Sequence, residues 1–570
     1  MPSTTNEEEE YVPGTRRLFD ENGKPLTEDG GNLRRHGDVV LVPQPSDSPD
    51  DPLNWSLARK SWHSALVLFV VGLTAATSND AGSGADGVNE EYGISYDVFN
   101  TGAGVLFAGI GYWCLLSSPA THLYGRRVLY LVGMVWGFIG SVWYGRIQNE
   151  ADTIWSQLFI GASESVGEAV VQLSLLDIWF EHQNGTTLGL YTLAMAVGTY
   201  LGPLIANHVS HAFGWRWIGY LGAIFSAATF IVLYFGLEET AFVRERYRVT
   251  EASPPYAANG ALLPEKMAQQ QQQHAPGADP IVTQKNQEQS GEIPRSTELT
   301  QPGSLPPAPP KPMSYFDRIR LITPAPNLVG IGAKQFVSRL WHTMRVFTFP
   351  AVWFAGLQWG LQNICLTFYL TVMEDNWYEE PWNYDDVQVG NMNIPCLIGS
   401  VLGCAYGGWC SDKFLLAMAR RKGGIMEAED RLWLMLLCMV VFPAGMLLFG
   451  IGSARGWDWP VPYVGLGFIG FGYGCAGDLS ITYLADSYPD MVLEGMVGVA
   501  VINNSLALVF AFVTSYWIAT GIEHCFIELG VISFVVLGLS WPMILWGKTC
   551  RRWTKGRYLR FLAIRDGFSQ

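Results

Sequence analysis

Long apolar runs without charge recur along the chain, and short segments rich in Lys, Arg, Asp or Glu separate them. The uncharged runs are 98–125, 128–145, 186–215, 217–237, 347–373, 387–411, 432–454, 496–522 and 529–547. Three further segments are apolar but contain acidic residues: 61–83, 153–178 and 460–485. Because a helix needs about 20 apolar residues to cross a bilayer, the pattern predicts an all-α integral membrane protein with twelve transmembrane helices.

Composition agrees with this pattern. Only 15% of the 570 residues are charged, whereas soluble domains carry about 25%. The alternative, a very large soluble helical protein, would need many buried helices longer than ordinary core helices. No basic, aromatic-rich patch indicates nucleic-acid binding, the nine cysteines form no CxxC pair, and neither a phosphate-binding loop nor a nucleophile elbow occurs. We therefore expect no metal, no cofactor and no enzymatic activity.

Basic residues indicate the orientation of the predicted helices. They gather in alternate connections, namely Arg59, Lys60, Arg126, Arg127, Arg244, Arg246, Arg248, Lys413, Arg420, Arg421 and Lys422, and again in the C-terminal tail. The connection 374–386, on the opposite side, is acidic. The positive-inside rule then places both termini in the cytosol. We expect the plasma membrane as the location, with the vacuolar membrane as the alternative.

The chain divides into two halves and a linker. We predict a disordered cytosolic tail at 1–60, six helices in 61–237, a cytosolic linker at 238–346, six helices in 347–547 and a basic cytosolic tail at 548–570. Residues 249–312 of the linker are rich in Pro, Gln, Ser and Ala, a composition that cannot bury enough apolar surface to fold. Six helices, a linker and six helices match transporters that bind their substrate between two halves near the membrane midplane.

Acidic residues inside a predicted span are the strongest chemical signal. Glu164 and Glu168 lie four residues apart, on one face of a helix, and Gln172 continues that face. An acid at the centre of a membrane helix costs about 2.5–3.5 kcal/mol. Two carboxylates one turn apart in an apolar setting do not both ionise easily, so the pair can hold and release a proton. The same pair can instead hold an organic cation, and we interpret Asp177 and Asp486, at helix ends, as structural.

Two connections carry a recognisable motif. SPATHLYGRRVLYL at 118–131 resembles the loop signature of the major facilitator superfamily through Gly125, Arg126 and Arg127, although His122 stands where that family has an acid. The corresponding connection of the second half, GWCSDKFLLAMARRKGG at 408–424, keeps Gly408 and Asp412, followed by Lys413. The resemblance implies that these loops gate the movement of the halves. The alternative is a basic loop that only follows the positive-inside rule.

Further segments narrow the resemblance. Gly198, Gly202 and Pro203 resemble the Gly-x-x-x-Gly-Pro signature of antiporters in span 5. DPLNWS, TAATSND, GWRW, LEETAFVR and GIMEAEDRLWL are similar to the fungal drug:proton antiporter branch, within the clade that includes polyamine and cation transporters. The resemblance covers about 51–248 and 345–550. Gln157 departs from it, because the family usually has an Arg linked to proton coupling at that position.

In that superfamily, spans 1, 4, 7 and 10 line a central cavity, and the polar residues of this chain fall on those four spans. The candidates for substrate or proton binding are Asn79, Asp80, Glu164, Glu168, Gln172, Gln358, Trp359, Gln362, Asn363 and Asp478. Glu168 ranks first because it aligns with the Glu of the family's span 4. The alternatives are that Glu164 is solvated near the outer boundary and that Trp359 serves packing alone.

These expectations combine into one leading function. The resemblance implies a monomeric secondary transporter that exports a small organic compound, such as a drug or a secondary metabolite, from a fungal cell in a proton-coupled cycle of alternating access. Its partners are then the substrate, protons and the lipid bilayer. One alternative is proton-coupled uptake of polyamines or other organic cations. An alternative from another class is a non-transporting membrane sensor whose linker and tail transmit a signal.

Overall fold

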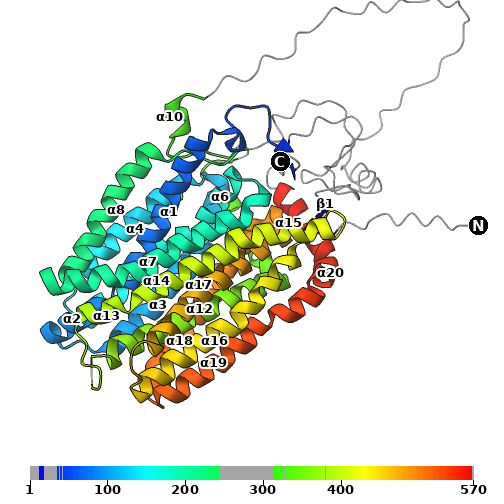
Figure 1. Cartoon of the computed structure of the whole chain (residues 1–570). Helices are drawn as coiled ribbons and strands as arrows, with labels where there is room; N and C mark the ends of the chain where they lie inside the picture. The colour runs from blue at the N-terminus through cyan, green and yellow to red at the C-terminus, as the bar shows by residue number, and fades with distance from the viewer. Residues whose placement is uncertain are drawn as a thin grey trace, which may run out of the picture.

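A computed structural model describes residues 12–17, 35–36, 39–41, 43–242, 313–325, 328–378 and 380–567. The stretch 249–312, which the composition predicts to be disordered, lies outside the described residues. The described residues form a helical bundle (Figure 1). We call the end of the bundle that carries the start of α1, β1 and the end of α20 the terminal face, and the end that carries α2 and α13 the distal face.

The first half of the bundle, the N-half, contains the first six predicted spans. Its helices are α1 (Leu57–Asn79), α2 (Ala85–Tyr92), α3 (Tyr96–Leu123), α4 (Arg127–Tyr144), α5 (Glu150–Val166), η3 (Gly167–Val171), α6 (Gln172–Ile178), α7 (Asn184–Phe213) and α8 (Arg216–Gly236). α5, η3 and α6 follow one another directly and form the fourth span. The short α2 lies between the first and second spans on the distal face.

The second half, the C-half, repeats this arrangement. Its helices are α12 (Pro350–Asn376), α13 (Asp386–Asn391), α14 (Asn393–Cys404), η7 (Ala405–Cys410), α15 (Ser411–Arg421), η8 (Ala428–Leu434), α16 (Met435–Arg455), α17 (Val461–Ser487), α18 (Val492–Ile518), α19 (Ile522–Gly538) and α20 (Ser540–Gly567). α10 (Tyr315–Arg318) and α11 (Ala333–Thr343) precede it. The strands are β1 (Thr15–Arg17), β2 (Arg35–His36), β3 (Val39–Val40) and β4 (Ile425–Glu427).

Ten helical segments of the described residues are long and apolar enough to cross a membrane. The two predicted spans outside that group are α5 to α6 and α12, where acids and amides interrupt the apolar sequence. The outer helices show the reverse of a soluble pattern, because large apolar side chains of α8 such as Ile224, Ile231 and Phe235 are exposed. Acids such as Glu164 and Asp478 are buried instead. A bundle with an apolar exterior and a polar interior is suited to lipid.

The two halves meet along two seams. α3 of the N-half packs along α18, and α7 packs against α14, η7 and α17 (Figure 1). Tyr112 and Ser505 share a hydrogen bond across the first seam at 3.2 Å, and Asn100 Nδ2 donates to Ser515 Oγ at 2.7 Å. These seams bring the predicted polar spans of both halves to the middle of the molecule.

The prediction that all of 1–60 is a disordered tail is wrong for its described part. β1 pairs antiparallel with β4, with Thr15 opposite Glu427. Arg551 of α20 donates hydrogen bonds to the carbonyl of Pro13 and to the hydroxyl of Thr15. These partners come from the C-half, so no pattern local to the N-terminal sequence indicates them.

The predicted basic tail at 548–570 is helical over most of its length, because α20 continues to Gly567 on the terminal face. Arg551 is buried and donates to Glu429 at 2.8 Å. Nearby, burial alone would raise the pKa of Glu427, but hydrogen bonds from Lys422 and Lys548 lower it to about 2. Ion pairs with the connection between the eighth and ninth spans therefore anchor the start of this tail.

Part of the predicted linker is also ordered. Residues 313–325 and 328–346 contain α10 and α11, and residues 323–325 run along the end of α3. Thr323 N donates to Tyr124 O at 2.9 Å, and Ala325 N donates to Leu123 O at 3.0 Å. The linker's C-terminal third therefore belongs to the terminal face of the bundle.

Candidate functional site

Two buried carboxylates lie near the middle of the N-half. Glu164 is in the last turn of α5 and Glu168 is in η3, and only 7% and 4% of their surfaces are exposed. η3 is a π-helical turn of five residues, a feature that recurs at functional sites. Both acids remain inside the bundle, so the alternative in which Glu164 is solvated is wrong.

Glu168 faces the C-half. Its Oε2 accepts a hydrogen bond from Nδ2 of Asn503 in α18 at 3.5 Å, and the indole of Trp359 in α12 lies beside the same carboxylate. Glu164 interacts with the hydroxyl of Ser78 in α1. Sequence reasoning missed Asn503, and the available signal was an Asn pair inside the otherwise apolar run 496–522.

Buried aromatic side chains adjoin this carboxylate. The ring centroids of Trp359 and Tyr473 are 5.2 Å apart, and those of Tyr473 and Tyr200 are 5.8 Å apart. Tyr191 of α7 is fully buried and close to both Glu168 and Gln172. Aromatic faces next to carboxylates can bind organic ammonium groups through cation–π attraction and ion pairing.

Several polar atoms in the core of the bundle make no hydrogen bond to the described residues. They are both amide atoms of Gln362 and Oδ1 of Asn503. Buried polar atoms in folded proteins are nearly always paired with protein or with ordered water. The core therefore offers hydrogen-bonding capacity to a polar ligand or to water.

Asp478 of α17 forms a second acidic site, nearer the terminal face. It is fully buried, and its Oδ1 accepts from Thr482 Oγ1 at 3.1 Å. Its Oδ2 makes no hydrogen bond to the described residues and lies against three glycines that cradle it. A Cβ atom added at Gly189, Gly407 or Gly408 would come within 3.0–3.1 Å of that oxygen. The glycines let α7 and η7 approach the carboxylate, so Asp478 lies at the seam between the halves.

An ionic network joins the halves at the terminal face. Asp412 accepts hydrogen bonds from the backbone amides of Gly185 and Thr186, at 3.1 and 2.7 Å, and so caps the start of α7. Arg431 has no exposed side-chain surface and pairs with Asp412 at 2.8 Å and with Asp486 at 2.6 Å. Asp412 therefore lies where the motif predicts a gate, whereas Arg431 was not predicted.

Gly125, Arg126 and Arg127 of the first-half motif make contacts close to their own connection. Gly125 has a φ of 92°, and a Cβ atom there would lie 2.5 Å from Oε2 of Glu239. That carboxylate oxygen accepts hydrogen bonds from the backbone amides of Arg126 and Arg127, at 3.0 and 3.1 Å. Arg126 also pairs with Asp177. These contacts join the three motif residues to the N-half and to the 238–346 segment.

The remaining candidates make their hydrogen bonds or contacts away from Glu164 and Glu168. Gln358 Nε2 donates to the carbonyl of Val536 in α19 at 2.7 Å, and Asn79 Nδ2 donates back to the carbonyl of Ala75 at 2.8 Å. Asp80 is half-buried at the distal end of α1, and Asn363 is buried in α12. Lys413 is exposed, with its Nζ 3.4 Å from the Trp409 ring centroid. Among the described residues, no group of three His, Cys, Asp or Glu side chains is arranged to hold a metal ion.

The glycines of the span 5 motif bring α7 against α1. A Cβ atom at Gly198 would collide with the carbonyl oxygen of Gly72, and one at Gly202 would lie 2.7 Å from the Cα of Ala76. Both obstacles are backbone atoms, which cannot move aside cheaply. Close helix contact through small residues is typical of membrane proteins, and here it positions α1 beside the acidic span.

We expect Gly198→Ala to lower the stability of the protein by about 1–3 kcal/mol, the usual cost of overpacking. Gly467→Ala is the matched control, because the Cβ atom there would meet nothing closer than 3.7 Å, and an alanine inside a helix stabilises by roughly 0.5–1 kcal/mol. Thermal unfolding of both variants in detergent measures the difference. Equal unfolding temperatures would show that the α1–α7 contact is not tight.

Comparison with known proteins adds to this geometry. The family described as the Major Facilitator Superfamily matches residues 64–512. The uncharacterized MFS-type transporter C1271.10c from Schizosaccharomyces pombe is 46% identical, and the alignment covers 98% of this chain and 95% of that protein. Protein HOL1 from Saccharomyces cerevisiae is 44% identical over 99% of both chains.

More distant similarities extend over most of the chain as well. The MFS antiporter QDR3 from Candida albicans is 22% identical, with 95% of this chain and 83% of that protein aligned. Among solved structures, the proton:xylose symporter XylE bound to 6-bromo-6-deoxy-D-glucose has a TM-score of 0.54 at 11% identity, over 86% of this chain and 97% of that one. The likeness to XylE concerns the fold alone.

Proposed function

The chain belongs to the major facilitator superfamily and is a transporter rather than an enzyme, and we propose that it exchanges small organic cations for protons by alternating access. The cation binds at Glu164 and Glu168. With the terminal face in the cytosol, as the positive-inside rule predicts, and with a plasma-membrane proton gradient directed inward, this exchange exports the cation.

One observation carries the proposal. Glu164 and Glu168 are buried one helical turn apart, and within the described residues neither carboxylate pairs with a Lys, Arg or His. A buried carboxylate without a basic partner must be neutralised by a proton or by a cationic ligand. The aromatic rings beside Glu168 favour an organic cation over a hydrated metal ion.

Competition between the two neutralising species supplies the coupling. A proton that occupies the pair removes the negative charge that holds the cation, and a bound cation disfavours protonation. Each turnover can then carry one species in each direction without a separate proton site. Gln157 is buried in α5 where the family has an Arg, which supports direct coupling at the carboxylates.

A second candidate, uptake of organic cations together with protons, is favoured by Asp478. This buried acid is separate from Glu168 and lies on another helix of the seam. A proton on Asp478 and a cation on Glu168 can move in the same direction, because neither excludes the other from its site. The sign of proton movement distinguishes the two mechanisms.

The test uses the full-length protein in liposomes that enclose a pH-sensitive dye, with equal pH on both sides and the membrane potential clamped by potassium and valinomycin. We add a polyamine, a monovalent organic cation or a neutral sugar outside. Exchange predicts that the lumen becomes alkaline with a cation and does not change with the sugar. An acidified lumen would support the symport candidate. Flux of neutral compounds alone, or of none, would contradict the proposal.

A further inference from the structure

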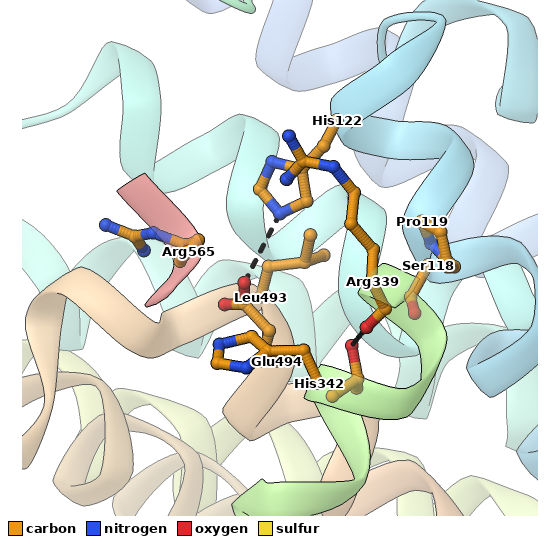
Figure 2. A pocket seen from close by; sticks show the side chains of 9 residues that line it. Ser118, Pro119, His122, Arg339, His342, Leu493, Glu494 and Arg565 are labelled. Carbon is orange, nitrogen blue, oxygen red and sulfur yellow. Dashed lines mark hydrogen bonds and ion pairs between the residues drawn. The ribbon is translucent and has the colours of Figure 1, made fainter. Parts of the chain in front are cut away.

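A histidine and a glutamate meet across the seam between the halves on the terminal face. Nε2 of His122, in the last turn of α3, lies 3.4 Å from Oε1 of Glu494, in the first turn of α18 (Figure 2). The exposed fractions of their side chains are 31% and 6%. Neither Glu164 nor Glu168 lines the small pocket beside this pair, so the proposed cation exchange does not use it.

The second half makes the corresponding contact with the opposite charge. His122 and Asp412 occupy equivalent places in the two copies of the loop motif, and α7 and α18 are the fifth spans of their halves. Asp412 accepts the backbone amide of Thr186, the third residue of α7, and Glu494 is the third residue of α18. The internal repeat therefore forms the same contact between the halves twice, once through an acid and once through a base.

The two contacts differ in how they respond to protons. A carboxylate that accepts amide hydrogens ordinarily remains charged above about pH 5. Histidine is the side chain whose charge ordinarily changes between about pH 5 and pH 8. A protonated imidazole at His122 forms an ion pair with Glu494, whereas a neutral imidazole offers only the weaker, uncharged interaction. One of the two contacts therefore depends on the pH at the terminal face.

The other charged groups beside the pair come from two helices. α11 contributes Arg339 and His342, and α20 contributes Arg565 (Figure 2). Burial lowers the pKa of His342, which disfavours its charged form. The guanidinium groups stay charged at every physiological pH, so they act on His122 as a constant repulsion that the Glu494 carboxylate opposes. His122 is then the group of this cluster whose charge follows the pH.

We propose that His122 binds a proton from the cytosol and that the resulting ion pair with Glu494 holds the terminal face closed. The ion pair forms only while the end of α3 and the start of α18 are together, so the closed arrangement binds this proton more tightly than the open one. By linkage, a falling cytosolic pH shifts the population toward the closed arrangement. With the terminal face in the cytosol, as the positive-inside rule predicts, this proton enters and leaves on one side of the membrane. It regulates opening and is separate from the proton exchanged at Glu168.

The test measures the distance between the halves in full-length protein by double electron–electron resonance in lipid nanodiscs. Spin labels at Ala58→Cys, at the start of α1, and Ala417→Cys, in α15, report on the terminal face, since both positions are exposed. The two half-buried native cysteines, Cys410 and Cys550, are replaced with Ser. A longer distance then marks molecules in which the terminal face is open.

All measurements carry Glu164→Gln/Glu168→Gln, so that the central carboxylates do not contribute to the pH response. We expect the ratio of closed to open molecules to rise about three- to tenfold between about pH 8 and about pH 5.5. His122→Gln should remove this rise and keep the ratio seen at high pH. His122→Arg has a permanent charge and should keep the ratio seen at low pH. His342→Gln is the matched control from the same cluster, and we expect it to retain the rise.

Each outcome bears on the proposal. A rise that survives in His122→Gln, or that is absent from the parent protein, would overturn it. A His122→Arg protein as open as His122→Gln would show that charge at this position does not hold the halves together. If His122→Gln does not fold, Glu494→Gln removes the other partner and must abolish the rise. Because transport is not measured and both central acids are replaced, failure here leaves the proposed cation exchange untouched.

Discussion

Replacing Glu168 with Gln is expected to abolish cation-dependent proton movement in liposomes, with a loss of about 100-fold or more in coupled rate. Gln has nearly the same shape but carries no negative charge and cannot exchange a proton. Hydrogen bonds to charged groups contribute about 1.5–3 kcal/mol each, and roughly 2.8 kcal/mol corresponds to 100-fold in affinity. Asn503 Nδ2 donates to this carboxylate at 3.5 Å and can donate to the oxygen of Gln as well, so the fold is retained.

The matched control is Glu150→Gln, because Glu150 is in the same helix, α5, but is exposed in its first turn. We expect that variant to keep its coupled rate within about twofold. Glu164→Gln should weaken cation binding without abolishing it, since Glu168 keeps one charge in the cluster. Coupled flux that survives Glu168→Gln while Glu164→Gln abolishes it would place the exchange at Glu164 instead. Flux unaffected by both variants would remove the cluster from the mechanism.

The membrane helices could be predicted from the sequence because lipid imposes a simple rule. Every backbone group in the bilayer must be paired within its own helix, so long uncharged runs such as 217–237 correspond closely to helices such as α8. The same rule makes buried acids conspicuous, since Glu164 and Glu168 interrupt an apolar span. Burial of Glu168 could therefore be anticipated before any tertiary contact was known, whereas the sequence left open whether Glu164 is solvated near the outer boundary.

Contacts between distant segments could not be predicted in the same way. Arg431 follows two acids in a stretch that reads as an ordinary charged loop, and only the fold brings it to Asp412 and Asp486. Asn503 reads as a polar exception in α18 until that helix is packed against η3. These pairings depend on how the two halves face each other, a relation that no local periodicity encodes.

The two copies of the loop motif also show that a shared sequence pattern does not predict tertiary contacts. Their resemblance predicts equal roles, yet Arg126 and Arg127 bind Glu239 within the first half and its following segment, whereas Asp412 caps α7 across the seam. Asp412 can reach across the seam because the backbone N–H groups at the start of α7 have no partner within that helix and can donate hydrogen bonds to a carboxylate. The motif therefore did not reveal that Asp412 contacts the other half, nor that His122 of the first motif pairs with Glu494 of α18.

Replacing Arg431 with Met is expected to destabilise the protein by about 3–5 kcal/mol, the usual cost of removing one partner from a buried ion pair. The Arg431 side chain is fully buried between Asp412 and Asp486. Without it, two carboxylates remain in a buried setting with their positive partner gone. Thermal unfolding in detergent measures the loss. Hydrogen exchange at Gly185 and Thr186, whose amides Asp412 accepts, should accelerate because the seam at the terminal face separates.

Arg455→Met provides the control for this prediction. Arg455 is also paired with an acid, Glu523, but its side chain is 56% exposed on the distal face, and exposed pairs contribute about 0–1 kcal/mol. A loss in Arg431→Met no greater than in Arg455→Met would show that the buried network does not hold the halves together. Faster hydrogen exchange at the start of α7 with an unchanged unfolding temperature would mean that Arg431 affects only the contact between the halves and not the stability of the fold. The predicted result, loss of both, would identify the network as a contact that must break for the halves to separate at the terminal face.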